Sequence, residues 1–283
     1  MKINENHLYL DLLKKTLTAS IYEESAWSIV EMDRTDWRQD INIFRLLKNF
    51  IKHQIVQYLD SRSYLLVKKN SYDPVAREDG RDWPQMLGYT MIGVKRLDNL
   101  QSCIENILAN RIPGDFIETG VWRGGATIFM RAMLKHYRIT DRLVWVADSF
   151  EGLPSPKSIT DGHDLSSVRH LKISSDEVKK NFQKFGLLDD QVRFLEGWFS
   201  ETLPKFPGTA ISILRLDGDM YSSTMDALDA LYPKVSMGGY VIVDDYYSWN
   251  SCREAVSDYL NRHNLNPQIL AIDGDAAFWK VGA

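Results

Sequence analysis

The stretch Asp115-Phe-Ile-Glu118-Thr-Gly120-Val-Trp-Arg-Gly124-Gly125 runs from apolar residues into a turn rich in glycine, and a helical pattern follows it. Successive apolar residues are typical of strands buried on both faces of a sheet. Because glycine has no side chain, the backbone of such a turn can approach a ligand closely, although glycines after a strand can also serve only to form the turn. The stretch predicts a strand, a candidate ligand-binding turn and a helix, the first unit of an α/β fold.

The chain beyond this unit repeats the alternation of strand and helix. The order of apolar runs and helices predicts a parallel sheet with right-handed crossovers and helices on both faces. The last two runs flank Asp273-Gly-Asp275, a hairpin signal, so we expect a mostly parallel seven-stranded sheet with an antiparallel terminal strand. The predicted strands are 116–119, 143–147, 192–195, 211–216, 240–243, 268–272 and 277–281, and the predicted helices are 127–136, 175–185, 222–231 and 253–263.

The first 70 residues precede this alternation, and we interpret them as an N-terminal helical extension to an α/β domain at 71–283. Apolar residues between 37 and 66 recur at three- or four-residue steps, the period of an amphipathic helix. Their stripe would pack on the chain's own core or on a second subunit. Prolines and glycines predict a loop at 71–88, and another helix is expected at 94–109. The stripe consists of Ile41, Phe44, Leu47, Ile51, Ile55 and Leu59.

The composition narrows the classes of function. The 283 residues are 44% hydrophobic and 25% charged, ordinary globular values, and a net charge of -4 gives no electrostatic reason to expect nucleic acid. We therefore expect a small-molecule partner. Cys103 and Cys252 lie far apart without a cysteine or histidine cluster, which argues against a disulfide framework and against zinc. Since no signal-peptide pattern and no run of about twenty apolar residues occurs, we expect a cytoplasmic protein without a membrane partner.

Three carboxylates follow two of the predicted strands. Asp217 follows the strand at 211–216, and Asp244 and Asp245 follow the strand at 240–243. Clustered acids repel one another unless they are protonated, paired or bound to a cation. Mg²⁺ prefers oxygen ligands and keeps positions for substrate oxygens, although Mn²⁺ or Ca²⁺ would accept the same donors. A cation there could activate a hydroxyl, with Asp217 as both ligand and general base. Asp219 is expected to be a helix N-cap or a supporting acid.

Other polar residues after the strands suit a nucleoside cofactor. Glu118 could accept a hydrogen bond from it. Asp148, followed by Ser149, comes some thirty residues after the first strand, as expected for a carboxylate that binds ribose hydroxyls, although Asp148 could instead cap the next turn. Gly197-Trp198 could provide an aromatic wall for adenine, or Trp198 could be a core residue.

A long polar segment at 155–175 interrupts the pattern after the second strand. Segments of this length in compact domains are often lids or binding loops. His163 and Asp164 could contact an acceptor there, and solvent exposure is the alternative.

Six ordered motifs, spread from about Asp82 to the C-terminus, resemble the macrocin and mycinamicin O-methyltransferase family. The N-terminal 70 residues exceed what we expect of that family. The resemblance implies a class I methyltransferase (Rossmann-like) sheet, S-adenosylmethionine as cofactor and a hydroxylated natural product as acceptor. The motifs are Tyr89-Thr-Met91-Ile-Gly, Phe116-Ile-Glu-Thr-Gly-Val-Trp-Arg-Gly-Gly125, Ala147-Asp-Ser-Phe-Glu-Gly-Leu-Pro154, Leu195-Glu-Gly-Trp-Phe199, Leu214-Arg-Leu-Asp-Gly-Asp219 and Gly238-Gly-Tyr-Val-Ile-Val-Asp-Asp-Tyr246.

The resemblance also implies roles for individual residues. It places Mg²⁺ on Asp217, Asp244 and Asp245, gives Tyr246 a substrate contact and suggests a homodimer or higher homo-oligomer. The fainter similarity to catechol O-methyltransferase departs at Met220, where that enzyme has a lysine base, so the carboxylate of Asp217 is the candidate base here. The implied cofactor-binding residues are Tyr89, Thr90, Met91, Glu118, Gly120, Arg123, Gly124, Gly125, Asp148, Ser149, Gly197 and Trp198.

The leading hypothesis is therefore Mg²⁺-dependent transfer of a methyl group from S-adenosylmethionine to a hydroxyl of a sugar or polyketide-type metabolite. A nicotinamide-dependent oxidoreductase is the alternative enzyme, disfavoured because the glycines do not follow Gly-x-Gly-x-x-Gly and no Tyr-x-x-x-Lys pair lies near the carboxylates. A non-catalytic scaffold is the alternative of another class, since fold alone does not establish function.

Overall fold

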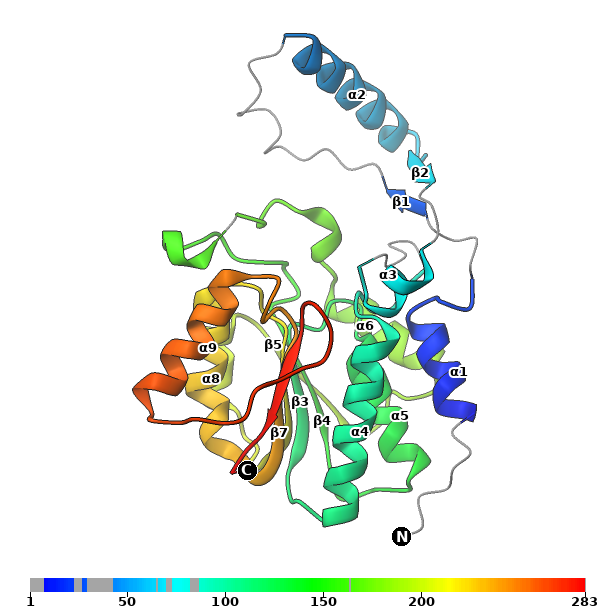
Figure 1. Ribbon diagram of the computed structural model, residues 1–283. Coiled ribbons are helices and arrows are strands. Elements are labelled where there is room, and N and C mark those ends of the chain that lie inside the picture. Colours follow the sequence, from blue (N-terminus) through cyan, green and yellow to red (C-terminus); the bar gives the residue numbers. More distant parts are fainter. Residues whose placement is uncertain are drawn as a thin grey trace.

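A twisted seven-stranded sheet forms the centre of the protein (Figure 1). The computed structural model describes residues 8–22, 27–29, 43–64, 66–69, 73–81, 87–162 and 164–282. The strand order is β5-β4-β3-β6-β7-β9-β8, with β9 antiparallel to both of its neighbours and the pairs from β5 to β7 parallel. The strands are β3 (Asp115–Thr119), β4 (Val144–Asp148), β5 (Val192–Glu196), β6 (Ile211–Leu216), β7 (Val235–Val243), β8 (Leu270–Ala271) and β9 (Ala277–Lys280).

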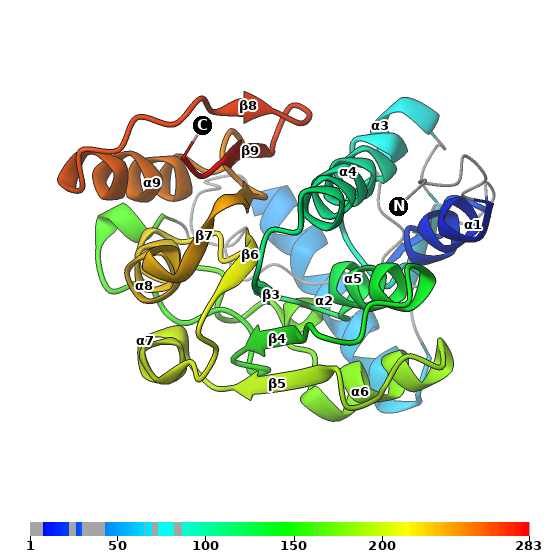
Figure 2. The ribbon, with the colours of Figure 1, turned by 90° about the horizontal axis from the view of Figure 1, so that it is seen from below.

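Helices cover both faces of this sheet, as Figure 2 shows from below. One face carries α1 (Leu8–Leu17), α4 (Val94–Asn110), α5 (Gly125–His136) and α6 (Ser175–Lys184). The other carries α8 (Tyr221–Leu231) and α9 (Asn250–Arg262), beside the short α7 (Phe199–Thr202). Successive residues of β3 point to opposite faces, so Phe116 joins the first core and Ile117 the second. The two cores explain why the strands are apolar on successive residues.

The predicted sheet and its helices are confirmed, including the antiparallel strand after the hairpin at Asp273-Gly-Asp275. Most boundaries agree within about three residues. The exception is β7, which begins at Val235 rather than 240 because the strand continues through Gly238 and Gly239. Gly238 has φ 84°, and the register with β6 shifts in this region, so the apolar pattern is interrupted although the strand is not.

The prediction that residues 1–70 are helical throughout was wrong. Two short strands, β1 (Trp27–Ile29) and β2 (Val67–Lys69), pair antiparallel with Trp27 opposite Lys69. Strands of three residues are too short to show a period, which is why the pattern did not predict them. The predicted loop at 71–88 contains the short helix α3 (Pro74–Glu78), where proline occupies the first turn and Asp73 caps the helix by accepting from the Val75 and Ala76 amides.

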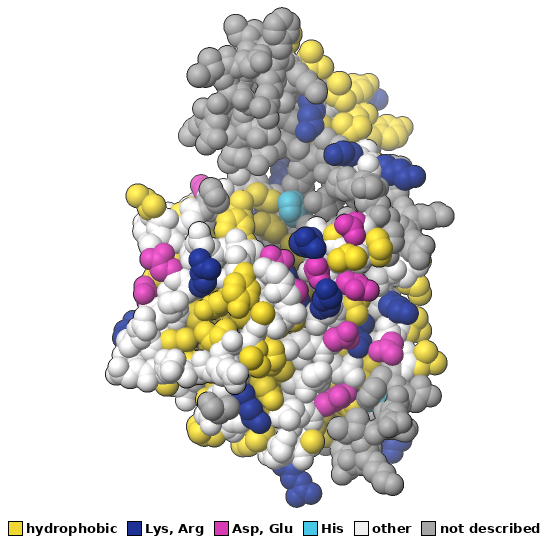
Figure 3. Space-filling model, viewed as in Figure 1, with side chains coloured by type: hydrophobic (Ala, Val, Ile, Leu, Met, Phe, Trp, Pro, Cys, Tyr) yellow, Lys and Arg dark blue, Asp and Glu magenta, His cyan; other side chains and the backbone are white. Residues whose placement is uncertain are grey.

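The amphipathic helix predicted at 37–66 is α2 (Ile43–Ser61), and residues 37–42 of that prediction lie outside the described residues. In Figure 1 this helix stands apart from the sheet. Leu47, Phe50, Ile51, Ile55 and Tyr58 are each about half exposed or more, and hydrophobic side chains of α2 face solvent in Figure 3. These five side chains therefore do not pack on the chain's own core. Among the described helices, none has the length and apolar character needed to cross a bilayer.

Candidate active site

A cavity of about 610 Å³ lies at the carboxyl ends of the central strands. It is bounded by residues that follow β3, β4, β5, β6 and β7, the edge where open α/β sheets bind ligands. Eleven of the residues singled out in the sequence line it: Thr90, Met91, Glu118, Gly120, Asp148, Ser149, Trp198, Asp217, Asp219, Asp244 and Asp245.

The glycine turn after β3 requires glycine for steric reasons. Gly120 has φ +87°, and a β-carbon there would lie 1.8 Å from the backbone oxygen of Asp217. A β-carbon at Gly125 would lie 2.5 Å from the backbone oxygen of Tyr89, which accepts a hydrogen bond from the Gly125 amide at 2.9 Å. The first glycine lets two strand ends meet, and the second lets the Tyr89 segment lie against the start of α5.

Asp148 holds this turn in place. Its Oδ2 accepts a hydrogen bond from the Val121 amide, and its Oδ1 accepts one from the Phe150 amide, both at 2.8 Å. Burial raises the pKa of Asp148, and these backbone hydrogen bonds lower it in part. The turn-capping role considered for Asp148 is therefore present. Asp148 also lines the cavity, so it could contact a ribose there as well, and that contact stays a prediction.

Five of the expected cofactor residues support the cavity without lining it. Arg123 donates to the Gly88 backbone oxygen at 2.9 Å, and Tyr89 packs edge-on against Phe185 with ring centroids 5.0 Å apart. The amide of Gly197 donates to the Asp148 backbone oxygen at 2.9 Å. The five residues, which lie next to the residues that line the cavity, are Tyr89, Arg123, Gly124, Gly125 and Gly197.

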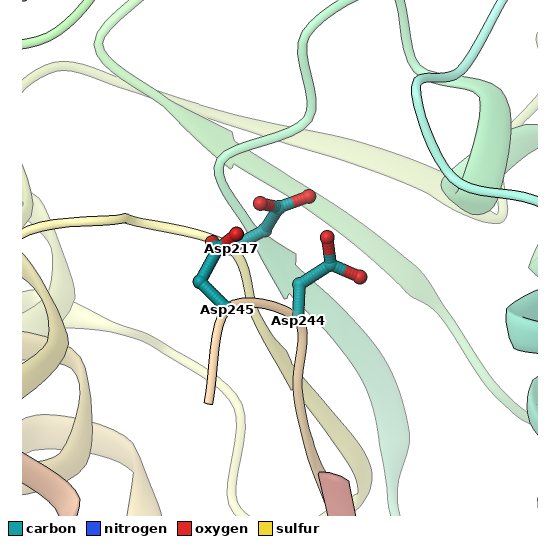
Figure 4. Close-up of side chains that lie close together, drawn as sticks. All are labelled: Asp217, Asp244 and Asp245. Carbon is teal, nitrogen blue, oxygen red and sulfur yellow. The ribbon is translucent and has the colours of Figure 1, made fainter. Parts of the chain in front are cut away.

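Asp217, Asp244 and Asp245 converge at the ends of β6 and β7 (Figure 4). One carboxylate oxygen from each lies within 4.8 Å of the others. Burial, followed by the charge of neighbouring acids, raises the pKa of Asp217 and of Asp245 well above the ordinary value. The same burial raises the pKa of Asp219, which shares a hydrogen bond with Asp245, to about 6. The cluster is thus costly to ionise without a positive charge.

Two buried arginines supply part of that charge. Arg215 donates to Asp217 at 2.8 Å and also to Glu118 and Asp244. Arg96 of α4 donates to the other oxygen of Asp244 at 2.6 Å and to Asp273 at 2.7 Å. Both oxygens of Asp244 therefore face guanidinium groups. Arg96 could not be identified from the sequence, because its position in a helical pattern does not show that acids after β7 and in the terminal hairpin surround it.

The donor set suits a hard divalent cation. Within the described part of the chain, the buried Oδ2 of Asp245 has no hydrogen-bond partner, and no hydrogen bond is made to Oδ1 of Asp217. An unpaired buried carboxylate oxygen is unfavourable, and a cation would satisfy it. The oxygen ligands that Mg²⁺ prefers are therefore present, two of them uncommitted and the third shared with arginines.

The opposite side of the cavity is formed by residues of the segment at 153–171, by the first turns of α8 and by two residues that directly precede α9. Asp164 is exposed and accepts a hydrogen bond from Ser166, and it does not line the cavity. His163 lies outside the described residues. Tyr246 packs edge-on against Tyr247, with ring centroids 4.9 Å apart, and does not line the cavity either. We call this side the acceptor lobe and define it by Leu153, Pro154, Lys157, Leu171, Ser222, Ser223, Asp226, Ser248 and Trp249. Leu153 and Pro154 belong to one of the six motifs, and Lys157 and Leu171 lie in the segment at 155–175 that was predicted as a lid or binding loop. The other five were not singled out from the sequence, because helix starts carry no periodic signal of function.

Comparison with known proteins adds to this geometry. The family model described as Macrocin-O-methyltransferase (TylF) matches residues 6–281. The match thus includes most of the N-terminal 70 residues, which had been expected to exceed the family pattern. The chain is 40% identical to demethyldecarbamoylnovobiocin O-methyltransferase of Streptomyces niveus, over 98% of this chain and 94% of that enzyme. It is 41% identical to mycinamicin III 3''-O-methyltransferase of Micromonospora griseorubida, over 98% of this chain and 97% of that enzyme.

Solved structures give the same picture. The O-methyltransferase NovP superposes with a TM-score of 0.78 at 40% identity, over 98% of this chain and 99% of that one. The calicheamicin methyltransferase CalS11 superposes with a TM-score of 0.57 over 90% of this chain and 99% of that one; at 17% identity this similarity concerns the fold alone.

Proposed function

The chain belongs to the macrocin O-methyltransferase (TylF) family, and from that premise we propose that it transfers a methyl group from S-adenosylmethionine to a hydroxyl of a small natural product in a Mg²⁺-dependent reaction. Membership of this family identifies the chain as an S-adenosylmethionine-dependent O-methyltransferase of natural-product biosynthesis. The two alternative hypotheses, a nicotinamide-dependent oxidoreductase and a non-catalytic scaffold, therefore lose their support. The metal, the acceptor class and the residue roles are the proposal. The observation that carries them is the acidic cluster between the glycine turn and the acceptor lobe.

The cofactor would lie over the ends of β3, β4 and β5. Gly120 allows close approach of the backbone, and the buried Oε2 of Glu118, which has no partner among the described residues, is available to accept from the cofactor. Asp148 and Ser149 would receive the ribose, and Trp198, 36% exposed, offers a flat face for adenine. Thr90 and Met91 would close the other side. Bound S-adenosylmethionine supplies an electrophilic methyl group for direct displacement.

Asp217, Asp244 and Asp245 would hold Mg²⁺. The bound ion supplies Lewis acidity, which lowers the pKa of an alcohol beside it. Asp217 would take the hydroxyl proton, so that the acceptor oxygen could displace the methyl group that bound S-adenosylmethionine supplies, with S-adenosylhomocysteine as the leaving group. Arg215, held between Glu118 and Asp217, fixes the orientation of the base. Most of the acceleration would come from positioning and from stabilising the developing oxyanion.

The acceptor lobe suits a polyhydroxylated group. Ser222, Ser248 and Asp226 present hydroxyl and carboxylate groups to the cavity, and Trp249 presents an indole. Such a combination can bond sugar hydroxyls and cover the apolar face of a ring. One relative is named for 4'-O-methylation of a rhamnosyl tetracenomycin, in Streptomyces olivaceus, at 43% identity over 96% of this chain and 92% of that enzyme. We propose a sugar or polyketide-type hydroxyl as the acceptor of this chain.

A homodimer or higher homo-oligomer is part of the proposal. The exposed side chains of Leu47, Ile51, Ile55 and Tyr58 lie at steps of three or four residues and so form one face of α2. A continuous apolar face of this kind on a soluble domain is typical of a protein interface. A second copy presenting the same face would cover it symmetrically.

The test is a methyl-transfer assay on EDTA-treated protein. S-adenosylmethionine is added with demethyldecarbamoylnovobiocin, mycinamicin III and a panel of glycosylated polyketides, with and without Mg²⁺, and products are detected by mass spectrometry. We expect a product one methyl group heavier that requires Mg²⁺ and is lost in Asp245→Asn. A product formed equally well in EDTA would remove the metal from the proposal, and transfer to nitrogen or carbon alone would remove the acceptor class.

A further inference from the structure

The segment at 153–174 crosses the acceptor side of the cavity. Four of its residues, Leu153, Pro154, Lys157 and Leu171, line the cavity. Its described residues, 153–162 and 164–174, form two single turns of 3-10 helix, Ile159–Asp161 and Arg169–Leu171, and no longer element. What holds such a segment over the cavity therefore has to come from side chains.

Asp161 anchors the first half of the segment, whereas the second half is held by the Trp122 indole, which donates to the His170 backbone oxygen at 2.7 Å. Asp161 is 2% exposed, whereas its near neighbour Ile159 is 100% exposed, so the segment is not generally buried. The Oδ2 of Asp161 accepts a hydrogen bond from the Lys157 amide at 2.8 Å, which closes the local turn. Its Oδ1 accepts one from the Ser222 amide at 2.7 Å, which connects the segment to α8.

The hydrogen bond from Ser222 to Asp161 also caps the N-terminus of α8. The amides in the first turn of a helix have no partner within the helix and usually bond a local capping side chain. Met220, the capping residue of α8, provides no such bond. Asp161 provides it from a distant part of the chain, and its negative charge is also favourable at the positive end of the helix dipole.

The capped turn belongs to the candidate site. Ser222, Ser223 and Asp226 of α8 line the acceptor lobe, and α8 starts four residues after Asp217. One carboxylate thus joins the cover of the lobe to the helix that follows the proposed base. Burial alone would raise the pKa of Asp161, but hydrogen bonds from Ser222 and from the Lys157 and Ser158 amides lower it below the ordinary value, so the group is ionised at neutral pH.

We propose that Asp161 is a positioning residue that fixes the segment at 153–174 against the first turn of α8 and thereby sets the affinity for the acceptor. The effect on the acceptor rests on the proposed function, but the anchoring of the segment does not. Among the residues near the predicted acceptor contacts, Asp161 rather than Asp164 is the one turned inward.

The experiment compares Asp161→Ala, Asp161→Asn and Asp164→Asn in the full chain. Asp164 is the matched control, because it is an exposed acid of the same segment whose hydrogen bonds to described residues all come from Ser166. Limited trypsin digestion cuts this segment after Lys157, Arg169 and Lys172, and hydrogen exchange reports the amides of Lys157 and Ser222 directly. Neither readout needs a substrate, so absence of methyl transfer in the wild type would not affect them.

We expect Asp161→Ala to increase cleavage and exchange about tenfold or more, since a charged hydrogen bond anchors the segment. Asp161→Asn, whose carboxamide oxygen can still accept one bond, should lie between Ala and wild type and serves if the alanine variant does not fold. Asp164→Asn should match wild type. With an acceptor from the assay, KM should rise about tenfold in Asp161→Ala while kcat and S-adenosylmethionine affinity change little. Wild-type protection of the segment in both Asp161 variants would overturn the proposal.

Discussion

Gly120 and Asp217 directly follow the neighbouring strands β3 and β6, and they approach so closely that a β-carbon on Gly120 would lie 1.8 Å from the Asp217 backbone oxygen. The Asp217 amide in turn donates to the Thr119 backbone oxygen at 2.9 Å. The turn that would take the cofactor and the carboxylate that would take the hydroxyl proton are therefore adjacent in space. The strand ends can approach this closely only because position 120 has no side chain.

Gly120→Ala should destabilise the protein by at least about 2 kcal/mol, because alanine is strained at φ +87° and its methyl meets backbone that cannot move aside. Urea unfolding measures the loss, and calorimetry should show S-adenosylmethionine binding lost with it. Gly274→Ala is the control, since a β-carbon there meets nothing within 4 Å. Equal stability of the two variants would show that the ends of β3 and β6 lie farther apart than in the structure.

Asp217→Asn should lower kcat by about 10²- to 10⁴-fold, the usual contribution of a general base. Asparagine keeps the size of the side chain and can still accept from Arg215, but it cannot take the hydroxyl proton. Binding of S-adenosylmethionine, measured by calorimetry, should change little because the cofactor contacts lie on other strands. Turnover like that of the wild type would move the base to another residue.

Glu118→Gln should change how stability depends on pH. Burial raises the pKa of Glu118 from 4.5 to about 7, and Arg215 offsets only part of this effect. An acid whose pKa is raised by folding contributes stability below pH 4.5 that is lost as pH rises through about 7. The wild type should therefore lose stability relative to the glutamine variant over that window, by on the order of 3 kcal/mol.

Urea unfolding of the ligand-free protein at several pH values measures the difference for Glu118→Gln. Above pH 7 it should become constant. A difference that does not vary with pH would mean that Glu118 is ionised throughout and that its pKa is not raised.

The combined substitution Ile51→Glu and Ile55→Glu should convert the proposed oligomer to monomer, since two charges cannot be buried without partners at an apolar interface. Size-exclusion chromatography with light scattering reports the mass. Lys52→Glu, an exposed residue on another side of α2, is the control and should leave the mass unchanged. A wild-type chain that is monomeric at micromolar concentration would contradict the proposal for this face.

The sequence predicted the parts of the fold that repeat and missed the parts that depend on single contacts. The strand at 211–216 was evident although it contains Arg215, because four of its six residues are Ile or Leu. Glu118 and Asp244, which help to neutralise Arg215, come from the neighbouring strand β3 and from the end of β7. Pro74 is one of the residues on which the predicted loop at 71–88 depends, whereas in the structure it begins α3. Arg96 and Asp161 act through partners more than 60 residues away in the chain, and no local pattern could identify them.

The central claim is that one cavity takes both S-adenosylmethionine and a divalent cation, and calorimetric titration of the EDTA-treated wild type and of Asp245→Asn tests it most directly. We expect both proteins to bind one S-adenosylmethionine per chain, and only the wild type to bind Mg²⁺ at the buried cluster. If the wild type does not bind S-adenosylmethionine, the assignment of the cavity is contradicted. If the two proteins bind Mg²⁺ equally well, the assignment of the metal ligands is contradicted.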